Sequence, residues 1–324
     1  LDDVSITSVA PTNLAASNLT LQSAVVSWDA NGTSKWDIRY KKTSATEWTS
    51  VSGVTSNPYT LVGLESNKPY YVQVRAKAAI GNFNSAWSEQ LSFTTPYRKF
   101  SADNGYGQTL YYNVIDEENH YVALTYPNSA DPTNPWDGYT KPTGNLVLPS
   151  TVTNESVTYT VTQVGERAFR GCSGVTGVTI PSTVTVIDSY AFYGNWMTGQ
   201  LIIPNSVITI GVQAFDDAYN NSGNVELTIG EGVTSIGYAA FDMYALSSVH
   251  FNAINCTTMG ANVFGAYFTQ LTIGSQVTNI PAEAFRSRSA INNALIIPAS
   301  VQNIGTNAFK GCTALPSVYF EGGS

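Results

Sequence analysis

Charged side chains are scarce in this chain of 324 residues: Lys, Arg, Asp and Glu make up 12% of it, against roughly 25% in an average soluble domain. Residues 1–96 carry seven acidic and seven basic side chains, whereas residues 97–324 carry sixteen acidic and eight basic ones. Nucleic acid and anionic membranes are bound through clustered Lys and Arg. We therefore expect no nucleic acid among the partners and no membrane insertion of this region.

Side chains that carry catalysis or bind metals are also few. The two histidines, His120 and His250, lie 130 residues apart, and the three cysteines are Cys172, Cys256 and Cys312. A zinc site needs three or four clustered ligands, and an odd number of cysteines is not a disulfide framework. No phosphate-binding loop, dinucleotide fingerprint or nucleophile-elbow motif occurs. The sequence therefore predicts no catalytic residue, no cofactor and no metal.

Two arrangements of oxygen ligands leave weaker alternatives. The pairs Glu117-Glu118 and Asp216-Asp217 are adjacent in sequence, so they do not face one cleft as catalytic carboxylates must. The segment "NSADPTNPWDG" places Asp131, Asn134 and Asp137 three residues apart. Calcium uses such ligands, but a turn rich in proline explains the same residues.

No segment approaches the roughly 18 apolar residues that span a bilayer.

Residues 1–96 consist of short alternating runs separated by turn residues such as Asn31-Gly32 and Ser52-Gly53. Alternation of this kind predicts β-strands, and their spacing without a helical pattern indicates a β-sandwich. The predicted strands are 25–28, 36–40, 59–62, 70–76 and 91–93.

The sequence of this stretch resembles that of a fibronectin type III domain. The matching segments are "APTNLAASNLTLQSAVVSWDA", "WDIRYK", "LVGLESNKPYYVQVRA" and "SAWSEQLSFTTP". The resemblance implies an immunoglobulin-like β-sandwich with Trp28 in its core. It also implies a tyrosine corner, in which Leu64 precedes Tyr70 by six residues and the Tyr70 hydroxyl bonds to the backbone upstream. Such modules act as spacers or adhesive units.

The second part of the chain is repetitive. Clear copies of the unit are "IPSTVTVIDSYAF", "IPNSVITIGVQAF", "IGEGVTSIGYAAF", "IGSQVTNIPAEAF" and "IPASVQNIGTNAF". Successive anchoring phenylalanines are 23, 23, 26, 23, 21 and 24 residues apart. A period of this length indicates a leucine-rich-repeat solenoid. The anchoring residues are Phe169, Phe192, Phe215, Phe241, Phe264, Phe285 and Phe309.

The units resemble the BspA-like subfamily of leucine-rich repeats, known from bacterial surface proteins, in which Phe fills the deep position. "RGCSGV" and "KGCTAL" match its cysteine-containing segment. Elsewhere Tyr244, Tyr267 and Asn195 stand in place of that cysteine. The resemblance implies host matrix proteins or neighbouring bacteria as partners, and an extracellular or cell-surface location.

Each unit is expected to contribute one three-residue strand whose outer residues point inward and whose middle residue points outward. The segment that ends in Ala-Phe then returns through a short helical turn. Because one unit does not bury its apolar face alone, neighbouring units must stack. The predicted strands are 178–180, 201–203, 227–229, 249–251, 271–273, 295–297 and 318–320.

The predicted organisation is mainly β. A fibronectin type III-like sandwich spans 1–96. A β-hairpin cap and an irregular loop span 97–145, where "GQTLYYNVIDEENHYVALTY" supplies two alternating runs. A BspA-like leucine-rich-repeat solenoid of about seven repeats, with a short strand per repeat, spans 146–324. The cap is expected because the exposed end of a solenoid needs a cover.

Two surfaces are candidates for ligand binding. Tyr193, Trp196 and Tyr219 lie outside the apolar consensus of the repeat, and Tyr and Trp are favoured anchors in interfaces. His250 and Tyr319 belong to the outward strand positions. The full set of those positions is Thr179, Ile202, Thr228, His250, Thr272, Ile296 and Tyr319.

Three functions remain open from the sequence. The first is non-enzymatic protein binding or adhesion at a bacterial surface through the solenoid. The second is polysaccharide binding in a nutrient-capture system, which requires an exposed aromatic platform. The third is an accessory region of a larger secreted enzyme. The sequence does not identify the partner, which is a protein or a glycan.

Overall fold

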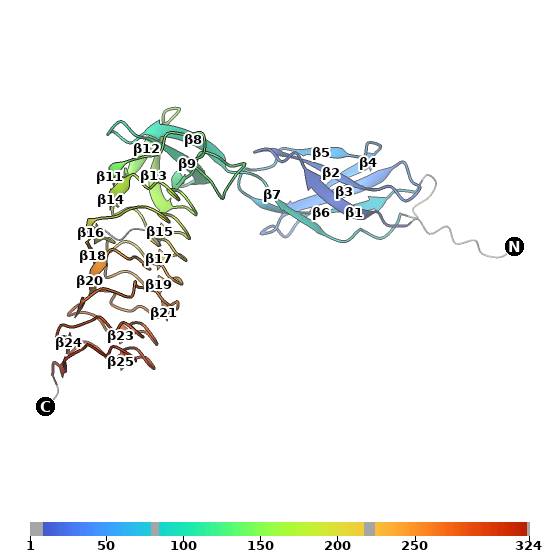
Figure 1. The fold of residues 1–324 in the computed structure, drawn as a ribbon. Helices are drawn as coiled ribbons and strands as arrows, with labels where there is room; N and C mark the ends of the chain where they lie inside the picture. The colour runs from blue at the N-terminus through green and yellow to red at the C-terminus, as the bar shows by residue number, and fades with distance from the viewer. Residues whose placement is uncertain (1–8, 79–83, 217–223, 323–324) are drawn as a thin grey trace. The chain divides into compact units, whose positions relative to one another are not determined.

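The computed structural model describes residues 9–78, 84–216 and 224–322. The chain forms two compact units, Leu1–Arg98 and Lys99–Ser324 (Figure 1). Throughout the described ranges the regular structure consists of strands, and no helix occurs. The mainly-β prediction, with a sandwich followed by a solenoid, is confirmed.

Two antiparallel sheets form the first unit. One has the order β1-β2-β5 and the other the order β4-β3-β6-β7. All five strands predicted by range are present. β1 and β4 lie outside the predicted ranges, and "TSVSGV" of β4 has little apolar alternation. The strands are β1 (Thr12–Ser17), β2 (Ser23–Asp29), β3 (Trp36–Lys42), β4 (Thr49–Val54), β5 (Tyr59–Val62), β6 (Pro69–Ala76) and β7 (Leu91–Thr94).

Aromatic side chains occupy the core of this sandwich. The rings of Trp28 and Trp36 are buried and meet edge to face at a centroid distance of 5.3 Å. The Tyr70 ring is buried and stacks on Phe93 at 5.8 Å. Its hydroxyl oxygen accepts a hydrogen bond of 3.0 Å from the amide of Glu65. The predicted core tryptophan and tyrosine corner are therefore both confirmed.

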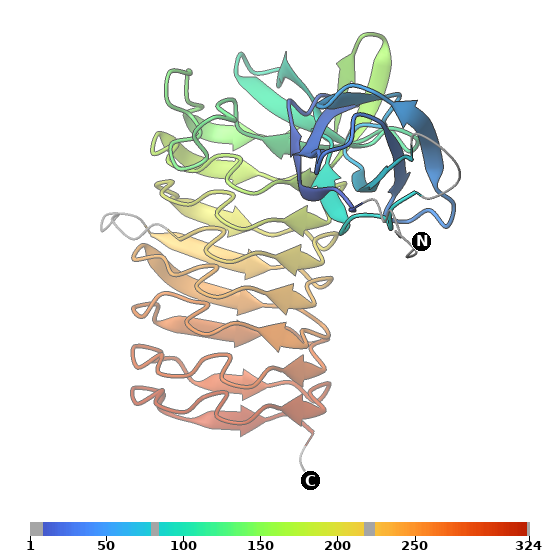
Figure 2. The same cartoon turned by 90° about the vertical axis from the view of Figure 1, so that its right-hand side faces the viewer.

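The second unit is a solenoid built from two columns of parallel strands (Figures 1 and 2). The first column, which we call the ladder sheet, has three paired groups, β11–β14, β16–β18–β20–β22 and β24–β26. Each predicted three-residue strand has a counterpart here: β24 and β26 have the predicted bounds, β18, β20 and β22 begin earlier, and β14 and β16 begin earlier and end one residue sooner. Its members are β11 (Gly144–Val147), β14 (Val175–Thr179), β16 (Gly199–Ile202), β18 (Val225–Ile229), β20 (Leu246–Phe251), β22 (Gln270–Ile273), β24 (Leu295–Ile297) and β26 (Val318–Phe320).

The second column, which we call the return sheet, was not predicted. In it the strands β13, β15, β17, β19 and β21 pair in parallel in this order, and β23 pairs in parallel with β25. After β13 each strand has two residues, which is too short for an alternating pattern to show in the sequence. Its members are β13 (Val157–Val164), β15 (Val186–Ile187), β17 (Thr209–Ile210), β19 (Ser235–Ile236), β21 (Thr258–Met259), β23 (Asn279–Ile280) and β25 (Asn303–Ile304).

The predicted helical turn of the return segment is wrong. Two residues before each anchoring Phe the backbone enters the left-handed region, with φ between 49° and 60°, and a right-handed helix does not continue through such a residue. The amide of Phe192 donates instead to the carbonyl of Ala214 in the next coil, at 2.7 Å. The left-handed residues are Arg167, Tyr190, Gln213, Ala239, Asn262, Glu283 and Asn307.

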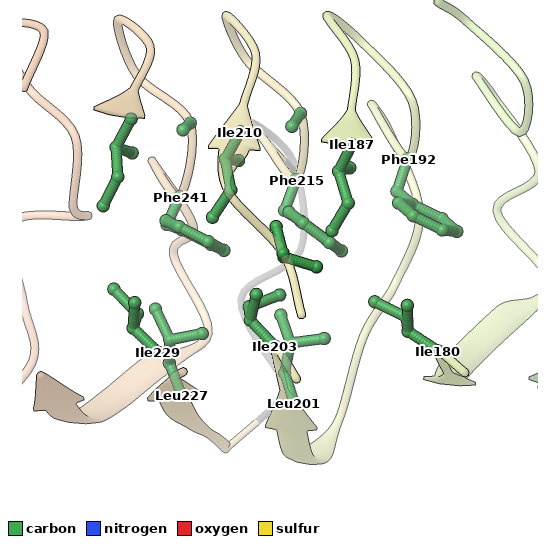
Figure 3. Close-up of a cluster of buried hydrophobic side chains, with 14 of the residues drawn as sticks. Ile180, Ile187, Phe192, Leu201, Ile203, Ile210, Phe215, Leu227, Ile229 and Phe241 are labelled. Atoms are coloured by element: carbon green, nitrogen blue, oxygen red, sulfur yellow. The ribbon is translucent and has the colours of Figure 1, made fainter. Parts of the chain in front are cut away.

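The predicted stack of phenylalanines is present in the core (Figure 3). Successive rings lie 4.9–6.2 Å apart, with angles of 7–16° between their planes. From the ladder sheet Leu201 and Ile203 point into the same core, whereas Ile202 between them is exposed. The predicted alternation is confirmed from β14 to β24, whereas all three residues of β26, on the last coil, are exposed. Stacking supplies the burial that one coil lacks.

Strands of the segment before the repeats extend the return sheet. β9 and β10 pair in antiparallel fashion, and β10 pairs in parallel with β13. β12 also pairs with β13, in antiparallel orientation. The edge of the first coil is thereby covered. The strands concerned are β8 (Arg98–Asp103), β9 (Thr109–Asp116), β10 (Tyr121–Thr125) and β12 (Thr151–Asn154).

Trp136 extends the phenylalanine stack beyond the repeats. Its ring is fully buried, lies 6.1 Å from the ring of Phe169 and is inclined to it by 21°. Its indole Nε1 donates to the carbonyl of Ala168 at 2.8 Å. The sequence predicted only an irregular loop here, so the role of this tryptophan was missed.

One position of the repeat accepts several residue types in the same structural role. Three residues after its own Phe, a side chain donates to the carbonyl of the Phe one coil earlier. Asn195 Nδ2 donates to Phe169 at 2.9 Å, Arg288 Nη1 donates to Phe264 at 2.6 Å, and Cys312 Sγ donates to Phe285 at 3.1 Å. Asn195 and the cysteine predicted at this position are therefore equivalent as donors.

Candidate binding surfaces

The ladder sheet presents one row of outward side chains along the solenoid. Ile202 and Ile296 are exposed on this row, and Tyr319 is exposed on the last strand. His250 is half-buried, and its Nδ1 lies 2.7 Å from Oγ1 of Thr272 on the neighbouring strand. The row therefore offers a nearly uncharged surface with apolar side chains, and the predicted residues His250 and Tyr319 both belong to it.

The turn that follows each Phe forms a second surface. Tyr193 is half-buried and meets Tyr190 edge to face at 5.9 Å. The guanidinium of Arg170 lies 5.3 Å from the Tyr193 ring, and that of Arg167 lies 5.2 Å from the Tyr190 ring. Tyr193 thus contributes to a cation–π cluster, which reduces the surface it offers to a ligand.

Trp196 lies in the same repeat, between the turn and β16, and half of its surface is exposed. Tyr219 lies outside the described residues. The predicted site residues are therefore not brought together in one place, because His250 and Tyr319 lie on the ladder sheet while Tyr193 and Trp196 lie beside the turns.

A pocket of about 220 Å³ lies farther along the turns of the solenoid. Its lining comes from three consecutive coils and includes Asp216, Asp242, Gly265 and the rings of Tyr244 and Tyr267. The two rings stack at 6.0 Å, with an angle of 26° between their planes. The sequence placed both tyrosines at the cysteine position but missed this pocket. The available signal for the pocket was that each tyrosine follows its own phenylalanine, Phe241 or Phe264, by the same number of residues in the sequence.

The carboxylates of the pocket influence each other. Asp216 is almost completely buried, and its Oδ2 accepts a hydrogen bond of 2.6 Å from Nε2 of Gln213. Partial loss of solvent around its carboxylate raises the pKa of Asp242, and the negative charge of Asp216 raises it further, while the positive charge of Arg288 opposes both. The pocket is an acidic site with aromatic walls.

The cysteine thiols are poorly suited to nucleophilic chemistry. Burial raises the pKa of Cys172 to about 12 and that of Cys256 to about 11, and the nucleophile in cysteine chemistry is the thiolate. Cys312 is half-buried, and burial raises its pKa as well. These environments favour a structural role for all three cysteines.

The oxygen ligands considered for calcium serve a turn. Asp131 Oδ1 accepts hydrogen bonds from the amides of Thr133 and Asn134, and its Oδ2 accepts one from Asn134 Nδ2. Within 9–78, 84–216 and 224–322, no group of three or more His, Cys, Asp or Glu side chains is arranged to hold a metal ion. Among the same residues, none belongs to a helix long and apolar enough to cross a membrane.

Comparison with known families agrees with the architecture. A model of the BspA type leucine rich repeat region matches six copies over residues 149–266 and 199–316, more than half of the chain. The chain belongs to the BspA-type leucine-rich-repeat family. A fibronectin type III domain model matches residues 9–94. Both predicted resemblances are confirmed. BspA-type repeats are typical of bacterial surface proteins, and both domain types commonly bind proteins and are typically non-catalytic.

Two solved structures are similar to part of the chain. One described as "Myokine structure" is 29% identical with a TM-score of 0.26, covering 28% of this chain and 99% of its own. The FN5 domain of Drosophila Lar is 22% identical with a TM-score of 0.25, covering 28% of this chain and 98% of its own. At these TM-scores neither likeness supports a functional conclusion.

Proposed function

We propose that this chain is a non-enzymatic adhesion module at the surface of a bacterium or in its surroundings. Its BspA-type solenoid binds a partner protein, and its fibronectin type III domain serves as a spacer or a second adhesive unit. The partner is a host matrix protein or a protein on a neighbouring bacterium.

The observation that carries this proposal is the outward row of the ladder sheet. Ile202 and Ile296 are 53% and 51% exposed although they are large and apolar. They stand on strands whose inward neighbours are buried in the continuous core, so the surface is rigid and loses little conformational entropy on binding. A rigid row of exposed apolar and small polar side chains suits a protein surface.

Matched substitutions test this assignment. The double variant Ile202→Gln and Ile296→Gln changes the row, whereas Ile208→Gln changes a residue 48% exposed next to β17 of the return sheet. On an array of matrix proteins and bacterial surface proteins, we expect the double variant to lose its signal and Ile208→Gln to keep it. Equal signals from all three proteins contradict a binding role for the row.

Polysaccharide binding is the second candidate, and the exposure of Trp196 favours it, because an exposed indole offers a stacking surface to a sugar ring. Glycans on the same array separate the two functions. Trp196→Ala and Tyr193→Ala should reduce glycan signals while leaving protein signals unchanged if the aromatic surface binds polysaccharide. Unchanged glycan signals in both variants remove this candidate.

A further inference from the structure

The pocket beside the turns is built by the repeat itself. The residue that follows the anchoring Phe is Asp216, Asp242 and Gly265 in three consecutive coils. A Cβ atom at Gly265 would lie 2.1 Å from the carbonyl oxygen of Met243, so only glycine fits at this position. The third coil therefore contributes backbone without a side chain at this position of the lining.

The walls of the pocket are accessible aromatic rings. Tyr244 and Tyr267 are 48% and 63% exposed although they stack on each other. The lining also contains Asp216, of which 6% is exposed, and Asp242, which is exposed. A ligand in this volume meets π faces and negative charge together.

Arg288, whose positive charge acts on Asp242, is bound to backbone carbonyls. Arg288 directs Nη1 to the carbonyl of Phe264 at 2.6 Å and Nε to the carbonyl of Arg286 at 3.1 Å. Its Nη2 lies 3.4 Å from Oδ1 of Asn262. Among the described residues none forms an ion pair with Asp242. The carboxylates repel each other, and a bound cation would relieve this repulsion.

We propose that this pocket binds an arginine side chain of a partner protein, with the guanidinium against the tyrosine rings and facing Asp216 and Asp242. The assignment rests on the proposed protein-binding function and names the chemistry of the partner. Guanidinium combines a planar face that packs on aromatic rings with donors that match carboxylates. A neutral sugar would stack on the rings but leave the carboxylate repulsion in place. The volume of about 220 Å³ suits one side chain.

Titration calorimetry at low ionic strength tests the pocket with acetylated tetra-arginine, tetra-lysine and tetra-citrulline peptides. Citrulline has nearly the shape of arginine but no charge. We expect wild-type protein to bind tetra-arginine, to bind tetra-lysine several-fold more weakly and to give no signal with tetra-citrulline. Equal binding of tetra-lysine overturns the assignment to arginine, and binding of tetra-citrulline overturns the electrostatic basis.

Three variants separate the pocket from general attraction to an acidic protein. Asp242→Asn and Tyr267→Ala should each weaken tetra-arginine binding about five-fold, the range of one lost ion pair or cation–π contact. Glu118→Gln removes one charge from the exposed turn between β9 and β10 and should change it less than about two-fold. Circular dichroism verifies the fold of each variant. Equal weakening by Asp242→Asn and Glu118→Gln overturns the proposal.

The result of the peptide titrations can be distinguished from the result of the protein array. If partner proteins bind on the array while the peptides do not bind, the pocket assignment fails and the adhesion function stands. If the peptides bind in the expected order while no protein on the array is retained, the arginine site stands and the ladder-sheet function fails.

Discussion

The sandwich and the solenoid use the same alternation of apolar residues to build different cores. In the sandwich two antiparallel sheets close around one cluster that contains Trp28, Trp36 and Tyr70. In the solenoid the core runs continuously from the cap to the last coils and gains one phenylalanine with each coil. The difference shows that a closed core limits the number of strands, whereas a repeated apolar stripe allows a stack to continue.

The two units also differ in how polar groups stabilise them. In the sandwich Asp37 is buried and receives hydrogen bonds from Ser52 Oγ at 2.7 Å and the Gly53 amide at 3.0 Å. It also forms ion pairs with Arg75 at 3.0 Å and Lys77 at 3.3 Å. In the solenoid, backbone hydrogen bonds from one coil to the next predominate. Stability in the sandwich thus depends on a charged cluster, and in the solenoid on neighbouring coils.

The largest effect should follow removal of a central ring. Phe215→Ala is expected to lower the free energy of unfolding of the solenoid by about 4 kcal/mol, since a fully buried ring is lost from between two stacked neighbours. Phe309→Ala removes the last, half-buried ring of the stack and should cost about 2 kcal/mol.

Hydrogen exchange measured peptide by peptide checks this pair. In Phe215→Ala, peptides from the adjacent coils should lose protection, while peptides from the sandwich should keep it. Equal losses in the two variants, or loss of protection in the sandwich, contradict the view that coupling passes only between neighbouring coils.

A smaller effect is expected from the charged cluster of the sandwich. Asp37→Asn should destabilise that unit by about 2 kcal/mol, because it leaves the positive charges of Arg75 and Lys77 without their partner. Thermal unfolding of the Asp37→Asn variant, compared with that of the wild-type protein, measures this destabilisation. If the solenoid transition moves instead of the sandwich transition, the separate stabilisation of the two units is refuted.

The same carboxylate gives the sandwich an acid dependence. Burial opposes ionisation of Asp37, but the hydrogen bonds from Ser52, Gly53, Arg75 and Lys77 outweigh it and lower its pKa from 3.8 to about 2. A pKa below that of the unfolded chain means that the stabilisation is present above pH 3.8 and is lost as the pH falls toward 2. Asp37→Asn should remove this part of the acid dependence, and an unchanged pH profile would exclude Asp37 as its source.

The smallest effect concerns thiol reactivity along the stack. Cys312 is half-buried near the last coil, whereas Cys172 and Cys256 are fully buried. Iodoacetamide should therefore modify Cys312 first, with the extent at each site followed by mass spectrometry. In Phe309→Ala, Cys312 should react faster while Cys172 keeps its slow rate. Faster modification of Cys172 in that variant would contradict nearest-neighbour coupling.

The repeat made much of the solenoid predictable. Residues at matching positions of successive units must occupy equivalent places in a stack. Phe215 and Phe241 could therefore be assigned to the core before their contacts were known. The alternation around Ile202 predicted which side chains point outward. In the sandwich, the approach of Trp28 and Tyr70 to the core followed from the resemblance to fibronectin type III domains.

Other features left no such pattern. The left-handed residues before each Phe include Arg167, Tyr190 and Glu283, and no residue type marks the position. Trp136 comes from a segment outside the repeats, so spacing did not place it on Phe169. For the candidate site, the sequence suggested exposed aromatics such as Trp196, but it did not bring Asp216 and Asp242 into one pocket, because that depends on the depth of the turns. Ligand binding by the predicted residues stays a prediction.

The interchangeable donors after Phe192, Phe285 and Phe309 have a consequence for the gene. Asn195, Arg288 and Cys312 make the same bond to the coil before them, so the bond at these three junctions does not depend on the residue type that supplies it. Duplication or deletion of the codons for one of these coils therefore keeps this bond available at the new junction. The length of the ladder sheet, and the number of acidic or aromatic sites along the solenoid, can change by recombination in single steps while the remaining coils keep their packing.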